Sequence, residues 1–103
     1  MANISSGCTV TNTFSLPCGE EDIAVLYITY QQNDVTVLEK TKEDCNFEGT
    51  TAIVRLSQED TLKFPQEDGQ IRIQLRLRTV EGTAMKSTVL TASPDELLKS
   101  GVI

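Results

Sequence analysis

The residues of this chain that could perform acid-base chemistry are mostly carboxylates, and they gather in short polar segments. Adjacent acids occur where the sequence predicts turns, as in Glu20-Glu21-Asp22, Glu43-Asp44, Glu59-Asp60 and Glu67-Asp68. General acid-base catalysis needs a carboxyl group whose pKa is shifted inside a pocket that excludes water. Adjacent acids in turns are typically solvated, and no spacing here matches an oxygen-ligand loop such as D-x-D-x-D-G. We therefore expect neither a catalytic carboxylate pair nor a metal site.

The candidate nucleophiles and soft metal ligands are three cysteines, Cys8, Cys18 and Cys45. Their spacing fits no C-x-x-C pattern, and the chain has no histidine, which excludes the zinc sites that need one. The absence of histidine also removes the usual base for a cysteine nucleophile, and Lys42 near Cys45 is a poor substitute. Buried reduced thiols are our default interpretation, with a Cys8–Cys18 disulfide across adjacent strands as the alternative. The sequence predicts no enzyme and no cofactor.

The clearest pattern in the chain is a strict alternation between residues 71 and 78. One parity holds aliphatic residues, namely Ile71, Ile73, Leu75 and Leu77, and the other holds Arg72, Gln74, Arg76 and Arg78. Because side chains of a strand point alternately to opposite faces, the strand should bury the aliphatics and present three guanidinium groups to water. The segment 80–83 predicts a turn into a second extended run, which makes 69–90 a hairpin.

Two interpretations of the arginine row remain open. It is either a solvated face screened by acids on neighbouring strands or a contact surface for another protein. On the second interpretation, the candidate assembly contacts are Arg72, Arg76 and Arg78.

The rest of the chain must position this hairpin, and its pattern is that of short strands separated by turns. We expect a first strand from Cys8 that ends at Pro17, then a strand at 23–30 that is apolar on both parities and therefore covered on both faces. Asn33-Asp34 predicts a hairpin turn into a strand at 35–41, and two short strands flank Glu48-Gly49. Ser57 and Asp60 predict the cap of one helical turn near 58–63. About seven strands with this spacing indicate an all-β, immunoglobulin-like antiparallel sandwich.

The two ends of the chain differ in character from this central pattern. We expect residues 1–7 to be a flexible lead-in, residues 8–93 to form the sandwich domain, and residues 94–103 to form a short helix with an apolar tail. Ser93-Pro94-Asp95-Glu96 has the composition of a helix N-terminus, and Gly101 is the expected stop. The apolar residues of this end are further candidate assembly contacts: Leu97, Leu98, Val102 and Ile103. They either fold back onto the domain or complete a neighbouring subunit.

Composition narrows the classes of partner. The chain has 103 residues, enough for one domain, and 15 acidic against 9 basic residues give a net charge of −6. This charge argues against a nucleic-acid partner, because phosphate neutralisation needs an excess of lysine and arginine. No apolar run is long enough for a membrane span and no secretory signal pattern is present, so we expect a cytosolic protein without a membrane partner. Tyr27 and Tyr30 differ in parity, so at most one faces solvent, and packing of both inside the sandwich is the simpler expectation.

Several segments of the chain carry a family resemblance through their order and spacing. These are LYITY, VLEKT, LSQEDTLKF, GQIRIQLR, EGTAMKS and the final KSGVI. In this order they resemble a family of small structural proteins of tailed phages and prophages of gut Firmicutes. At the level of the fold, the family is similar to the immunoglobulin-like N-terminal domain of phage baseplate upper proteins. Departures from the family pattern are the cysteines and Met85 with Lys86 before Ser87, which concern packing.

The resemblance implies a non-enzymatic virion structural protein of the tail, baseplate, neck or capsid surface. Its partners would be other virion proteins and copies of itself in a homo-oligomer, first in the cytoplasm of a bacterial host during assembly and then in the virion. The alternative is an immunoglobulin-like module that binds a carbohydrate or a surface ligand. The scarcity of aromatic residues disfavours that alternative, because carbohydrate sites typically show clustered exposed aromatics.

Overall fold

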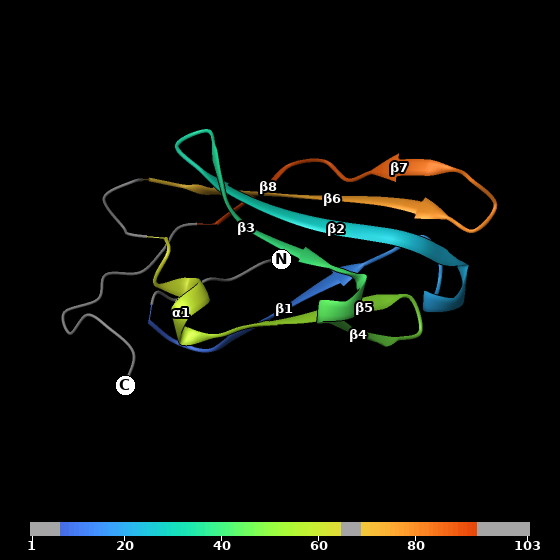
Figure 1. Cartoon of the computed structure of the whole chain (residues 1–103), viewed down its shortest axis with the longest axis horizontal. Helices are drawn as coiled ribbons and strands as arrows, with labels where there is room; N and C mark the ends of the chain where they lie inside the picture. The colour runs from blue at the N-terminus through green and yellow to red at the C-terminus, as the bar shows by residue number, and fades with distance from the viewer. Residues whose placement is uncertain (1–6, 65–68, 93–103) are drawn as a thin grey trace.

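The computed structural model describes residues 7–64 and 69–92, which form two antiparallel sheets packed face to face (Figure 1). The first sheet contains β1 (Val10–Ser15), β4 (Cys45–Glu48) and β5 (Thr51–Leu56). The second contains β2 (Ile23–Gln32), β3 (Val35–Thr41), β6 (Ile71–Thr79), β7 (Ala84–Lys86) and β8 (Leu90–Ala92). Three single helical turns connect strands: η1 (Glu20–Asp22), η2 (Lys42–Asp44) and α1 (Gln58–Thr61).

The strand order identifies the sandwich as immunoglobulin-like. The sheets read β1-β5-β4 and β3-β2-β6-β7, with β8 also paired to β6. These are the B-E-D and C′-C-F-G orders of immunoglobulin sheets, with β1 in the place of strand B. Within the described residues nothing occupies the place of strand A beside β1. The predicted fold class is thus confirmed.

The described residues form eight strands where the sequence predicted about seven, because the return strand of the 69–90 hairpin is interrupted. β7 pairs with β6 from Arg76 to Arg78, and β8 resumes the pairing from Ile71 to Ile73. Between them Ser87 maintains contact with β6: its amide donates to the Leu75 carbonyl over 2.9 Å, and its hydroxyl accepts the Leu75 amide over 3.0 Å. The edge of this sheet is therefore two short strands joined through one serine.

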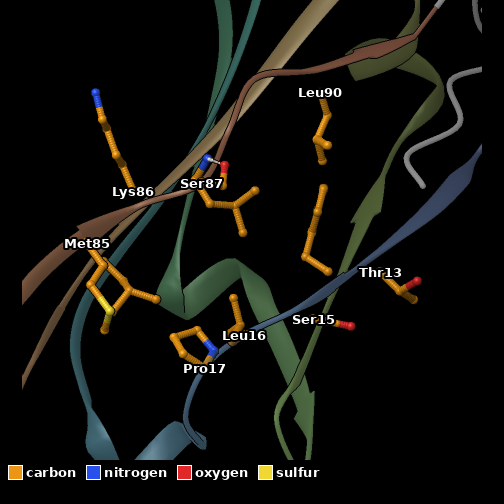
Figure 2. A pocket seen from close by; sticks show the side chains of 11 residues that line it. Thr13, Ser15, Leu16, Pro17, Met85, Lys86, Ser87 and Leu90 are labelled. Carbon is orange, nitrogen blue, oxygen red and sulfur yellow. Dashed lines mark hydrogen bonds between the residues drawn. The ribbon is translucent and has the colours of Figure 1, made fainter.

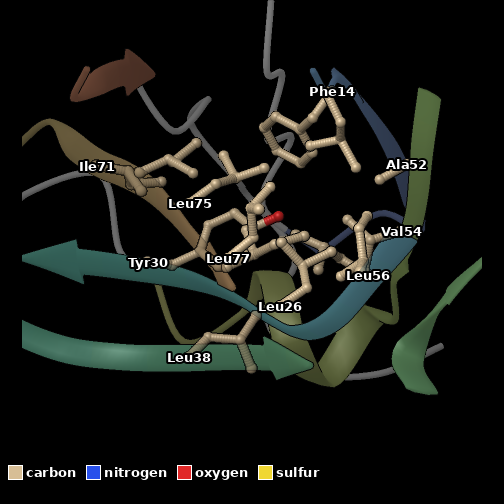
Figure 3. Close-up of a cluster of buried hydrophobic side chains, with 14 of the residues drawn as sticks. Phe14, Leu26, Tyr30, Leu38, Ala52, Val54, Leu56, Ile71, Leu75 and Leu77 are labelled. Carbon is tan, nitrogen blue, oxygen red and sulfur yellow. The ribbon is translucent and has the colours of Figure 1, made fainter. Parts of the chain in front are cut away.

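The core lies between the sheets and contains the aliphatic parity of β6 together with inward residues of β1, β2 and β5 (Figure 3). Tyr30 is fully buried, and its hydroxyl donates a 3.0 Å hydrogen bond to Oδ1 of the buried Asn12. Since Asn12 belongs to β1 and Tyr30 to β2, this bond joins the two sheets. The Phe64 ring lies against Tyr30 with a centroid separation of 6.0 Å.

The predicted cap at Ser57 is present. The Ser57 hydroxyl accepts the Asp60 amide over 3.1 Å, and the Asp60 carboxylate accepts the Ser57 amide over 3.0 Å. The same carboxylate receives the Lys40 ammonium at 3.1 Å, so α1 is tied to β3. This single turn closes one end of the sandwich.

Two expectations about local structure were wrong, and one alternative that the sequence left open is excluded. β2 is central in its sheet, as its apolar composition suggested, but only one of its faces is covered: Ile28 and Tyr30 are buried, whereas Tyr27 is 43 % exposed. Cys8 and Cys18 lie beyond opposite ends of β1, not on adjacent strands. Six extended residues span about 20 Å, far beyond the Cα separation of about 4.4–6.8 Å in a disulfide. All three thiols are free, but the expectation that they are buried was wrong: Cys8 is exposed, and Cys18 and Cys45 are only partly buried.

Within the described residues no helix is long and apolar enough to cross a membrane. The predicted lead-in before Gly7, the helix at 94–100 and the apolar residues Leu97, Leu98, Val102 and Ile103 lie outside the described residues.

Candidate functional site

The three arginines of β6 lie on the outer surface of the five-stranded sheet. Their aliphatic neighbours Ile71, Ile73, Leu75 and Leu77 are at most 7 % exposed, which places the opposite parity in solvent. Arg72, Arg76 and Arg78 are accordingly all exposed. The alternation that the sequence displays is the direct cause, because β6 packs against the second sheet on one side only.

The sequence favoured a face on which acids of neighbouring strands screen the arginines. The residues paired with Arg76 and Arg78 are not acidic. Arg76 lies between Tyr27 of β2 and Lys86 of β7, with no carboxylate on either side. Arg78 likewise lies between two uncharged residues, Val25 and Ala84. Neither Arg76 nor Arg78 forms an ion pair with a carboxylate of the described residues.

Arg72 is the one arginine of this row with an acidic neighbour. Its guanidinium is 3.8 Å from the Asp34 carboxylate, and both side chains are largely exposed. Exposed pairs of this length contribute little to stability. The β6 row therefore keeps most of its positive charge, and the exposed acid Glu39 on the same outer surface belongs to β3, on the far side of β2.

We call this surface the basic face; its members are Tyr27, Arg72, Arg76, Arg78 and Lys86. It collects four of the nine basic side chains of a chain whose net charge is −6. Two shallow hollows of about 280 Å³ and 200 Å³ lie on it, and Arg76 borders both. Small-molecule sites usually occupy about 300–1,000 Å³. The basic face is thus too flat for a typical small ligand and has the shape of a protein contact.

The acidic turns that the sequence offered as possible catalytic groups do not converge. The pairs Glu20-Glu21, Glu43-Asp44 and Glu59-Asp60 sit in three separate helical turns, and no group of described residues could hold a metal ion. The Thr41 hydroxyl donates to the exposed Glu43 carboxylate over 2.8 Å and lowers its pKa. For Asp60, partial burial raises the pKa, but hydrogen bonds from the Ser57 amide and the Lys40 ammonium outweigh burial and hold the pKa below its usual value.

Cys45 has the environment of an unreactive thiol. Burial, with a smaller contribution from the nearby Asp44 carboxylate, raises the pKa of Cys45 to about 11. Its thiol donates to the Thr41 carbonyl at 3.5 Å, while the Lys42 ammonium donates to the Ile23 carbonyl at 2.7 Å. The lysine that the sequence placed near Cys45 therefore has another partner, and the thiolate needed for nucleophilic attack is scarce at neutral pH.

Sequence reasoning missed two members of the basic face. Tyr27 was expected to pack inside the sandwich, and Lys86 was noted only as a departure from a family pattern. A signal for Tyr27 does exist, because Thr29 and Gln31 continue its parity with polar residues. The pairing of Lys86 with Arg76 has no sequence signal, since it depends on the register of β7 against β6.

The arrangement is therefore an exposed, flat and positively charged sheet surface, with Arg76 between the half-exposed Tyr27 and Lys86. Comparison with known proteins gives no match to a family model, to a curated protein or to a solved structure.

Proposed function

We propose that this chain is a non-enzymatic structural protein that assembles through the basic face. The observation that carries the proposal is the exposure of Arg76 and Arg78 without a carboxylate partner on their own sheet. Two exposed guanidinium groups without an ion pair among the described residues, on a chain of net negative charge, favour contact with a carboxylate-bearing surface and guide its approach. Arginine and tyrosine are also among the residues enriched at protein interfaces.

The setting proposed for this assembly is the virion of a tailed phage or prophage. It rests on the family resemblance of segments such as LYITY, GQIRIQLR and KSGVI. The partners are then copies of the chain and other virion proteins, met first in the host cytoplasm and kept in the virion. The acidic turns of a neighbouring copy, such as η1 with three exposed acids, provide surfaces of the opposite charge.

The test is the association state of the purified chain, measured by size-exclusion chromatography with light scattering across a concentration series. Arg76→Glu should shift the equilibrium toward monomer, because it places a carboxylate where the partner presents its own. Arg55→Glu is the matched control: Arg55 is equally exposed but belongs to β5 of the other sheet.

The proposal would be contradicted if the chain remains monomeric at high concentration and no partner is isolated with it from virions. Equal loss of association in both variants would assign the effect to net charge and not to the basic face. Binding on a glycan array by the folded protein would favour the ligand-binding alternative instead.

A further inference from the structure

A further hollow of the described residues lies on the opposite side of β6 from the basic face, where the edge of one sheet faces the edge of the other. It is a groove of about 510 Å³ between β1 and β7 (Figure 2). Six apolar side chains form most of its wall: Phe14, Leu16, Leu75, Leu77, Met85 and Leu90. We call it the edge groove.

The core is less completely covered along this groove than at the centre of the sandwich. Phe14, Leu16, Leu75 and Leu77 keep 5–9 % of their surface exposed, whereas Ile23, Leu26, Ile28 and Tyr30 keep at most 1 %. Both strands that flank the groove are also sheet edges. β1 pairs only with β5, and β7 pairs only with β6, within the described residues. The edge groove therefore combines incompletely buried aliphatics with two strand edges whose outer N–H and C=O groups face no described strand.

A site with these features suits an extended peptide. Main-chain groups of an added strand pair with an open edge, and alternate side chains enter the apolar space beneath it. The immunoglobulin strand order points to the same conclusion, because the place beside β1 that no strand of the described residues occupies is that of strand A. The occupant must then be a short segment that carries several aliphatic side chains.

We propose that residues 97–103 of a second copy of this chain occupy the edge groove. The segment reads LLKSGVI, so four of its residues are aliphatic. The inference rests on the proposed assembly function and supplies a second contact for it. Since Leu75 and Leu77 line the groove while Arg76 faces the other way, the edge groove and the basic face are separate surfaces of one strand. A molecule with two such surfaces can contact two neighbours at once.

The direction of the chain favours a second copy over the chain's own segment. β8 runs antiparallel to β6 and ends at Ala92 beside Ile71, so the chain leaves the sheet away from Leu77 and Met85. To place residues 97–103 in its own groove, the chain would have to turn back toward Leu77 within the four residues that follow Ala92. Residues 97–103 of a neighbouring copy can reach the groove without this change of chain direction.

Two native lysines allow a direct test on the full chain. Lys86 is at the rim of the edge groove, with its ammonium directed away from it (Figure 2), and Lys99 lies inside the LLKSGVI segment. Equal amounts of isotope-labelled and unlabelled chain are mixed and treated with an amine-reactive crosslinker, and the linked peptides are identified by mass spectrometry. We expect Lys86–Lys99 pairs that join a labelled to an unlabelled peptide.

Three variants locate the contact. Met85→Glu in the groove and Val102→Asp in the segment should each abolish the mixed pairs, because both place a charge in an apolar contact. Arg76→Glu should leave them in place, since it alters only the basic face. If Met85→Glu does not fold, Val102→Asp decides the result.

Single-isotope pairs without any mixed pairs would show that the segment docks in its own groove and would overturn the proposal. So would mixed pairs that survive both groove and segment variants, or no pairs at all. Association lost in Arg76→Glu without any Lys86–Lys99 pair would refute the groove contact and leave the proposed function standing. If mixed pairs persist and Arg76→Glu leaves association unchanged, the proposed role of the basic face is refuted and the groove contact stands.

Discussion

The hydrogen bond between Tyr30 and Asn12 joins the two sheets at a point where both side chains are at most 1 % exposed. Burial raises the pKa of Tyr30, and the nearby Cys45 and Asp60 act in the same direction, so the phenol stays protonated and acts as the donor. A buried polar group costs stability unless it is hydrogen-bonded. This pair therefore allows an asparagine to occupy a core that is mostly apolar.

Tyr30→Phe should lower the free energy of unfolding by about 1–2 kcal/mol, because the Asn12 oxygen loses this donor while the ring still packs on Phe64. Urea denaturation followed by circular dichroism measures the change. Tyr27→Phe is the control on the same strand, and its effect should be within about 0.5 kcal/mol because Tyr27 faces solvent. Similar losses in the two variants would contradict a special role for the sheet-to-sheet bond.

The single-turn helix α1 shows how a short element can be held by its cap. Four residues cannot form a stable helix alone, because the hydrogen bonds of the first turn do not offset the entropy lost when its dihedral angles are fixed. The Ser57–Asp60 capping box and the Lys40 ion pair provide the additional stabilisation that this short helix needs. The position of this turn was predictable from Ser57 and Asp60, which are close in sequence. The contribution of Lys40 was not, because it comes from β3, twenty residues earlier.

The cap also predicts a dependence of stability on pH. The pKa of Asp60 is lower in the folded chain than its usual value, so its contribution is fully present above about pH 3.9. That contribution is lost as the pH falls below this value and through the folded pKa. Asp60→Asn should therefore destabilise the chain by about 1–2 kcal/mol at neutral pH and by much less in acid.

Urea titrations of the wild type and Asp60→Asn at several pH values measure this difference. Glu43→Gln is the comparison, since the Glu43 carboxylate lies on the surface of η2 and caps no core-facing element. A constant gap between wild type and Asp60→Asn down to low pH would exclude the charged form of Asp60 as the stabilising species.

At the scale of the whole molecule, association depends more on how charge is distributed over the surface than on the net charge of −6. Four basic side chains share the outer surface of one sheet, and acidic residues occupy turns such as η1 and η2. An association driven by this asymmetry must weaken as salt screens it, because the Debye length falls from about 10 Å at 0.1 M to about 3 Å at 1 M. A contact in the edge groove is apolar, so added salt should weaken it little.

We accordingly expect added salt to dissociate only the contacts made by the basic face. Light scattering across a salt series should show smaller species in high salt, while the Lys86–Lys99 pairs between copies persist. Arg76→Glu, measured in low salt, should resemble the wild type in high salt. Association that is indifferent to salt would contradict a role for the guanidinium groups.

The local elements of this protein follow from its sequence because their signals are local. Alternation over 71–78 defines a strand, its buried side and its arginine side, and Asn33-Asp34 and Ser57 with Asp60 mark a turn and a cap within four residues. The exposure of Arg72, Arg76 and Arg78 was predictable for the same reason. None of these features requires knowledge of which strands become neighbours.

The features that bear on function depend on those neighbours and were decided by the tertiary structure. Tyr27 is exposed because no layer covers the outer side of β2, and Arg76 lacks a carboxylate partner because Tyr27 and Lys86 flank it. The edge groove exists because β1 and β7, far apart in sequence, end their sheets side by side. Pairing partners and sheet edges are properties of long-range contacts, and residue order records them only weakly.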